Sequence, residues 1–281
     1  MICEKAMSKS ANHNAVQAAA IRFFDRLGRS SVAALEELGR HGVLVAESIY
    51  WLVAGRRVGQ SVRLGALFSE MMEIGVRAIG IIGMMAAAIG AMLAIQGIYS
   101  LKIFGAEGHV VVGVAFSMVR EFAPLITGIL VAGRSGSALA ARLGTMKINQ
   151  ELDALEVMGI NPVRFLVVPS LLASMIMVPT LTMMSMTLGL WAAGIYVNAA
   201  LGISLTAFMD QTIDVLTVDD LLHGLGKSLI FGFLIAIIGV INGFLVKGGA
   251  EGVGKATTRS VVQCISAIVI TDMLFALVAT L

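Results

Sequence analysis

Charged residues are scarce in this chain. Asp, Glu, Lys and Arg make up 14% of the 281 residues, whereas hydrophobic residues make up 58%. A soluble domain usually has about 25% charged and roughly 45–50% apolar residues. The shortage of charge excludes an ordinary soluble protein, because its surface would offer water too few polar groups. It indicates instead that lipid surrounds the outer face of the fold.

Cysteine, histidine and proline are also rare. The two cysteines stand at opposite ends, Cys3 in a polar segment and Cys264 in an apolar one, and the four histidines are scattered. No disulfide is expected, and no spacing such as C-x-x-C predicts a metal site. The basic stripe typical of nucleic-acid binding is missing as well. Residues 1–31 have no apolar run of the signal-peptide type, so the first true span is expected to insert the chain.

Long apolar runs make up most of the remaining sequence. Because about 20 apolar residues in a helix cross the hydrocarbon core, such runs predict transmembrane helices. A β-barrel would alternate apolar and polar residues, which these runs do not. The predicted fold is an all-α integral membrane protein with five transmembrane helices, at about 74–101, 110–141, 163–197, 221–246 and 260–281.

Shorter segments join or precede these spans. Residues 1–29 are predicted to be a cytoplasmic extension, and 30–54 an amphipathic helix in the membrane interface. A helix packed on a soluble partner is the alternative for 30–54. Residues 204–216 are predicted to form a short surface helix, and the glycine-rich residues 247–259 a flexible loop.

Lysine and arginine predict the orientation of the chain. They gather in the N-terminal region, in 134–164 and in 247–259, whereas the other loops contain few. The positive-inside rule places these three regions in the cytoplasm. Five spans then place the C-terminus in the periplasm.

Arg120 and Glu121 are two charges inside the second span. Charges at membrane depth usually face the protein interior or a wet cavity. One interpretation is a polar lining past which a lipid head group moves, and the other is a pair at the outer water interface. Pro124, one turn further on, is expected to loosen the helix there.

Small residues recur every four positions after this pair, at Ala132, Gly136, Ala140 and Gly144, with Gly133 beside them. Such stripes allow helix backbones to approach closely in lipid. The pattern predicts a tight helix contact and leaves open whether it lies within one chain or between subunits.

Residues 147–159 predict a short amphipathic helix between two spans. Its apolar positions recur at helical spacing, its acidic residues lie elsewhere, and Gly159 ends it before Asn161-Pro162. An acidic cytoplasmic helix suits docking into a groove of a soluble partner. A helix that lies on the membrane is the alternative, against which the anionic inner leaflet argues. The candidate coupling residues are Glu151, Leu152, Asp153, Leu155, Glu156, Met158 and Gly159.

Two other features carry less weight. Residues 249–256 nearly match a phosphate-binding loop, but Ala256 replaces the hydroxyl residue that would bind magnesium. ATP binding by this chain is therefore not expected. Asp272 lies in the last span, either as a buried contact to another helix or near the outer surface.

Several strings together resemble the MlaE/YrbE permease family, in the order and spacing of that family. They lie at 120–124 (REFAP), 132–138 (AGRSGSA), 143–146 (LGTM), 153–164 (DALEVMGINPVR) and 256–262 (ATTRSVV). The resemblance covers roughly residues 30–281. An ion-driven secondary transporter would be expected to show internal repeats instead, and a membrane scaffold would not need an ATPase.

The resemblance implies a non-catalytic permease subunit of an ABC transporter in the bacterial inner membrane. It implies an elbow helix, five spans and a cytoplasmic coupling helix at 147–159, in a homodimer. The implied partners are two ATPase subunits that bind ATP and Mg²⁺, a hexameric MCE-domain ring and often a STAS-domain protein. The implied cargo is phospholipid, whose transport maintains outer-membrane asymmetry, with Arg120 and Glu121 near the lipid cavity. No cofactor is expected on this chain.

Overall fold

The computed structural model describes residues 39, 42–48, 50–51 and 63–279, which are helical almost throughout and contain no strand in these ranges. The chain divides into two units, Met1–Ala46 and Glu47–Leu281. The predicted extension 1–29 lies outside the described residues. So does part of the predicted interfacial helix 30–54, of which residues 39, 42–48, 50 and 51 are helical.

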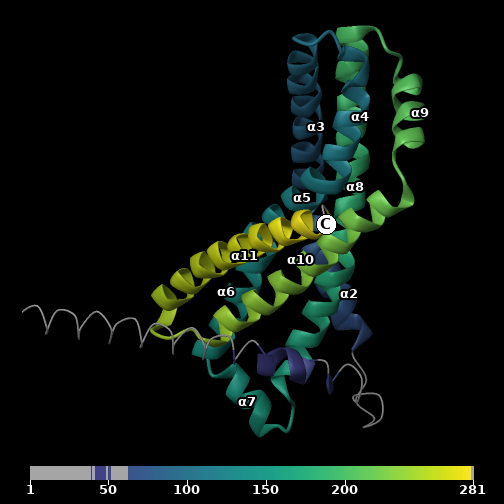
Figure 1. Cartoon of the computed structure of the whole chain (residues 1–281). Helices are drawn as coiled ribbons and strands as arrows, with labels where there is room; N and C mark the ends of the chain where they lie inside the picture. Colours follow the sequence, from purple (N-terminus) through teal and green to yellow (C-terminus); the bar gives the residue numbers. More distant parts are fainter. Residues whose placement is uncertain (1–38, 40–41, 49, 52–62, 280–281) are drawn as a thin grey trace, which may run out of the picture. The chain divides into compact units, whose positions relative to one another are not determined.

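The second unit is a bundle of helices (Figure 1). In chain order these are α2 (Leu64–Ile74), α3 (Ile79–Lys102), α4 (Val110–Phe116), α5 (Ala123–Val131), α6 (Ser137–Ile148), α7 (Glu151–Val157), α8 (Val168–Leu201), α9 (Leu205–Val215), α10 (Val218–Phe244) and α11 (Gly249–Ala279). Turns of π-helix connect some of these helices. Ser117–Phe122 joins α4 to α5, Ala132–Gly136 joins α5 to α6, and Val163–Val167 leads into α8.

Five helical stretches of the described chain are long and apolar enough to cross a membrane, which confirms the predicted fold class. They run over Leu64–Lys102, Glu107–Ile148, Val163–Leu201, Val218–Phe244 and Gly249–Val278. Most of them extend beyond the predicted ranges. Polar residues lie within these helices where they find partners. For example, Arg142 Nη1 lies 2.6 Å from Glu70 Oε1, and this ion pair joins α6 to α2.

The glycine-rich segment 247–259 is not the flexible loop that its composition predicted, because α11 begins at Gly249. Local contacts offset the low helix propensity of its glycines. Glu251 and Lys255 form an i,i+4 ion pair at 2.7 Å, and the hydroxyl of Thr257 donates to the carbonyl of Gly254. Gly252 packs so closely on the carbonyl of Lys247 that a side chain would not fit. The helix also removes the loop that phosphate binding would need.

Two apolar clusters form the core, and the 34-residue α8 contributes to both. One cluster lies among α3, α4, α8 and α9, around Met118 and Phe208. The other lies among α2, α5, α8, α10 and α11, around Phe231 and Ile235. Between Met118 and Val131 the chain passes from the first cluster to the second, and this is where Arg120 and Glu121 stand.

Helices α3 and α8 approach most closely where Gly90 meets Gly189. A Cβ atom on Gly90 would overlap the backbone carbonyl of Gly189. Such close approach between backbones gives helices in lipid their packing energy.

We expect Gly90→Ala to destabilise the protein, because the backbone of α8 has no flexible side chain to move aside. Overpacking of this kind costs about 1–3 kcal/mol. Thermal unfolding of the purified chain in detergent would measure it, with Gly80→Ala as the control, since Gly80 has no atom within 4 Å of its ideal Cβ position. Equal melting temperatures for the two variants would contradict this packing.

Candidate functional site: a charge cluster between helices

The N-terminus of α10 fixes the first acidic group of the site. Thr217 and Asp220 form a capping box, in which the backbone N–H and the hydroxyl of Thr217 donate to Asp220 Oδ2 at 2.9 and 2.7 Å. This motif satisfies the free N–H groups at the helix start. The other carboxylate oxygen, Oδ1, lies 3.6 Å from Arg120 Nη1. The capping box, a local motif of the sequence, thus places Asp220 where it pairs with Arg120.

A π-helical turn presents Arg120 and its neighbour Glu121 to the same helix. Adjacent residues of an α-helix point about 100° apart, but both side chains here contact α10. Arg120 meets Asp220, and Glu121 Oε2 accepts a 2.6 Å hydrogen bond from Lys227 Nζ. Asp220 and Lys227 are two turns apart, about 10 Å along the axis. The widened turn Ser117–Phe122 accompanies this double contact, and such π-turns are frequent at functional sites.

Lys227 is the centre of the cluster. Its side chain is 0% exposed, and its Nζ also lies 3.0 Å from Asp272 Oδ1 on α11. Asp272 Oδ1 receives no well-aligned hydrogen bond within the described chain, so this contact is mainly Coulombic. A buried ammonium is stable in such a place only when it is paired. Lys227 therefore ties α10 to the helix of Glu121 and to α11 at once.

The sequence predictions identified only part of this cluster. Asp272, whose side chain is 17% exposed, contacts Lys227 of another helix, as one of its two interpretations predicted. Lys227 was missed by the sequence predictions. A single lysine inside the apolar run 221–246 indicates a charge that pairs with an acid in another span, and this signal could have identified it. Pro124 lies in the first turn of α5, directly after the π-turn, where a proline lacking its N–H is tolerated.

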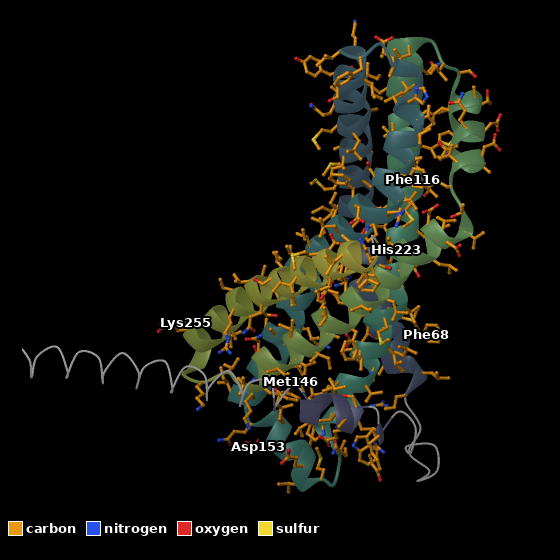
Figure 2. All side chains as sticks on the ribbon, in the orientation of Figure 1. Phe68, Phe116, Met146, Asp153, His223 and Lys255 are labelled. Carbon is orange, nitrogen blue, oxygen red and sulfur yellow. The ribbon has the colours of Figure 1, made fainter. Side chains whose placement is uncertain are left out.

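His223 lies beside these charges, one turn before Lys227 on α10. Figure 2 shows it where α10 meets the C-terminal part of α11, and its ring stacks edge-on against Phe275, with the ring centres 5.8 Å apart. Its Nε2 is buried and has no hydrogen-bond partner among the described residues. The cluster thus combines two basic side chains, three acidic ones and a histidine, with one excess negative charge when the histidine is neutral.

The outer members of the cluster face away from the protein core. The side chains of Arg120 and Glu121 are 34% and 39% exposed, although they lie inside a membrane-spanning helix. A charge that faces hydrocarbon directly is costly. These two groups therefore need a polar neighbour, such as a lipid head group, a wet cavity or another polypeptide.

The candidate coupling segment 147–159 is two elements rather than one helix. The chain breaks at Asn149 and at Gln150, whose φ is +60°, so that Ile148 ends α6 and Glu151 begins α7. The predicted end is correct, since Gly159 adopts φ +75°. Asn161 then caps the next helix by accepting from the N–H groups of Val163 and Arg164.

The predicted apolar face of this segment is divided. Of the residues on that face, Leu152 is 5% exposed and points into the bundle, whereas Met158 is 64% exposed. Val157, which is not on the predicted face, is 89% exposed. Glu151, Asp153 and Glu156 lie on or near the surface, and Asp153 pairs with Lys147 at 2.9 Å. Figure 2 shows Asp153 on α7, at one end of the unit, whereas His223 lies near its middle.

Comparison with known proteins identifies the family. Residues 67–278 match the family model described as Permease MlaE. The chain belongs to the MlaE permease family. It is 31% identical over 252 residues to a probable ABC transporter permease of Rickettsia typhi, which covers 85% of this chain and 96% of the relative. It is 36% identical over 204 residues to one of Synechocystis, covering 72% and 77%.

A third relative has a more specific name. The intermembrane phospholipid transport system permease protein MlaE of Haemophilus influenzae is 30% identical over 244 residues, which cover 86% of this chain and 92% of that protein. Family membership and the five apolar helices make this chain a multi-pass inner-membrane permease of the ABC transporter type, which implies an ATPase partner.

The small-residue stripe of this MlaE permease packs within the chain. A Cβ on Gly136 would lie 3.2 Å from Ile235 of α10, and one on Gly144 would lie 2.6 Å from Val246. Ala132 and Ala140 are fully buried, whereas Gly133 has open space beside it. The described stripe thus packs α6 and the π-turn before it against α10 and α11.

Proposed function

We propose that this chain moves phospholipid between the inner membrane and a periplasmic MCE-protein ring and so maintains the lipid asymmetry of the outer membrane. The observation that carries the proposal is the charge cluster, whose half-exposed members Arg120 and Glu121 lie inside a membrane-spanning helix. Family membership and the name of the Haemophilus relative support phospholipid as the cargo.

The cluster has the chemistry to hold a lipid head group in a membrane. The guanidinium of Arg120 offers several N–H donors to a phosphate, and its 3.6 Å contact with Asp220 is loose enough to be exchanged. Glu121 accepts from Lys227 through Oε2 and its side chain is 39% exposed, so Oε1 remains able to accept from another polar group. The chain thereby provides a path for a polar group while its own charges remain paired.

Movement would come from outside this chain, which performs no covalent chemistry and binds no cofactor. Two ATPase subunits, with ATP and Mg²⁺, would press on the segment 147–159. Its rigid attachment through the buried Leu152 and the Lys147–Asp153 pair would pass this force to α6 and α8. The working assembly is a homodimer with a hexameric MCE-domain protein and a STAS-domain protein. The N-terminus is cytoplasmic and the C-terminus periplasmic.

We expect Glu121→Gln to lower lipid transfer about tenfold while the assembly persists. A charge-assisted hydrogen bond is worth about 1.5–3 kcal/mol, and 1.4 kcal/mol is about a factor of ten. The measurement is ATP-dependent transfer of labelled phospholipid between vesicles that hold the transporter and the MCE protein. Glu121→Lys would be a poorer test, because it puts a second ammonium beside Lys227.

The control for this experiment is Glu251→Gln, which removes a carboxylate whose side chain is 79% exposed and far from the cluster in sequence. It should leave transfer unchanged. Undiminished transfer by an assembled Glu121→Gln complex would refute a role of the cluster in lipid passage.

A further inference from the structure

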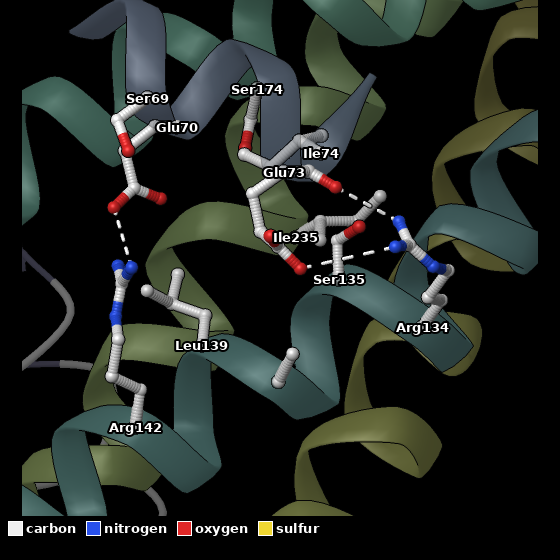
Figure 3. A pocket seen from close by; sticks show the side chains of 11 residues that line it. Ser69, Glu70, Glu73, Ile74, Arg134, Ser135, Leu139, Arg142, Ser174 and Ile235 are labelled. Carbon is white, nitrogen blue, oxygen red and sulfur yellow. Dashed lines mark hydrogen bonds and ion pairs between the residues drawn. The ribbon is translucent and has the colours of Figure 1, made fainter. Parts of the chain in front are cut away.

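A polar cavity lies between α2 and α6, and it shares no lining residue with the charge cluster. Its volume is about 400 Å³, and residues of α2, α6, α8 and α10 line it (Figure 3). Its two arginines, Arg134 and Arg142, belong to the region 134–164, which the positive-inside rule assigns to the cytoplasm. The charge cluster does not explain why this region should be polar.

Two acids of α2 face two arginines across this cavity. Arg142 Nη1 lies 2.6 Å from Glu70 Oε1, and Arg142 Nη2 donates to Ser170 at 3.4 Å. Arg134 Nη1 donates to the backbone carbonyl of Glu73 at 2.9 Å, but its Nη2 is 3.9 Å from the carboxylate of Glu73. Glu73 also accepts from Arg77. The cavity therefore contains one tight ion pair and one loose one.

Unused hydrogen-bonding groups remain around the cavity. A guanidinium has five N–H donors, and the contacts of Arg134 engage two of its nitrogens. Ser135, which is 9% exposed and lines the cavity, has a buried hydroxyl with no partner among the described residues. A buried unpaired hydroxyl is costly unless a ligand or water satisfies it. Ile74, Leu139 and Ile235 form apolar wall beside these groups.

We propose that this cavity binds a group that combines a phosphate with a primary amine, as in the head group of phosphatidylethanolamine. The phosphate would bind the guanidiniums of Arg134 and Arg142 and the hydroxyl of Ser135, and the amine would bind Glu70 and Glu73. The charges of these four ionic side chains cancel. An anionic group alone would leave the two carboxylates unpaired, whereas a zwitterion replaces both ion pairs together.

This inference rests on the proposed function and adds a head-group preference to it. The apolar wall suits a lipid, whose glycerol and first methylene groups would follow the head group. A soluble phosphoamine has the same polar chemistry, so the test must separate the two sources.

The test offers the purified full-length protein phosphatidylethanolamine and phosphatidylglycerol with identical acyl chains, in equal amounts in detergent micelles. Retained lipid is then counted by mass spectrometry. We expect phosphatidylethanolamine to be enriched roughly tenfold, since 1.4 kcal/mol corresponds to that factor. The enrichment should vanish in the double variant Glu70→Gln, Glu73→Gln and persist in Glu251→Gln.

Ser135→Ala covers the case in which the double variant does not fold. It removes only the unpartnered hydroxyl, which would bind the phosphate that both lipids share, so stability should hold while the retained amount of phosphatidylethanolamine falls about threefold. Soluble phosphoethanolamine is added in a separate arm. If it displaces the lipid at equal concentration, the ligand is a soluble phosphoamine, and if it does not, the ligand is the lipid head group.

Equal retention of the two lipids by the wild-type protein would overturn the proposal. So would unchanged enrichment in the folded double variant, or an unchanged amount of retained phosphatidylethanolamine in Ser135→Ala. Transfer of both lipids at equal rates, sensitive to Glu121→Gln, would then leave the proposed function standing without this cavity. Loss of the proposed function would appear instead as no lipid transfer by the assembled wild-type complex.

Discussion

Replacing Lys227 with methionine is expected to destabilise the permease by about 3–5 kcal/mol and to abolish transfer. The substitution leaves the carboxylates of Glu121 and Asp272 facing each other without the ammonium that contacts both. Removing one partner of a buried ion pair is strongly destabilising, because the remaining charge stays buried without compensation. Unfolding of the purified protein in detergent measures the loss.

A compensating variant separates stability from function. The triple variant Lys227→Met, Glu121→Gln, Asp272→Asn removes every charge of this group, and such apolar or neutral replacements are often close to neutral for stability. It should therefore fold nearly as well as the wild type and still fail to transfer lipid. Lys255→Met is the matched control, because the Lys255–Glu251 pair is largely exposed and contributes little. A single variant Lys227→Met as stable as this control would disprove the central position of Lys227.

Glutamate at both Val157 and Met158 is expected to weaken binding of the partner ATPase roughly 100-fold without unfolding the permease. These two side chains are apolar and strongly exposed at the end of α7, as expected of residues that anchor a helix in a groove. A few such anchors usually provide most of the binding energy of an interface, and each 1.4 kcal/mol is about a factor of ten. Co-purification and titration of the ATPase with the permease measure the effect.

The structure changes which residues make this test informative. Leu152, one of the candidate coupling residues, is buried, so a charge there would disrupt the packing of α7 itself. Ile213→Glu on α9 supplies the control, since it places a charge at an apolar side chain that is 72% exposed outside the segment 147–159. Retained ATPase binding in the Val157, Met158 double variant would show that this end of α7 is not the docking face.

Hydropathy predicted the class of fold, because long apolar runs in a chain so poor in charge can form little other than membrane-spanning helices. It was less able to place helix ends, as α2 and the first turns of α11 show. Polar residues continue both helices because they find partners. In α2, Arg142 of another helix pairs with Glu70, and in α11, Glu251 and Lys255 of the same helix pair with each other. The glycines in 247–259 predicted a loop because their low intrinsic helix propensity can be read from the sequence. The packing of Gly252 on Lys247, which favours the helix, cannot.

The sequence by itself determined that this protein is a five-span helical membrane protein, that Arg120 and Glu121 form its most unusual pair, and that a short acidic helix follows the second span. These properties depend on composition and on local periodicity. Only the tertiary structure decided which charges meet: Lys227 with Glu121 and Asp272, Asp220 with Arg120, and the acids of α2 with the arginines of the second span. The physical reason is that an ion pair in a membrane depends on the rotation and depth of two separate helices, and side-chain packing sets both.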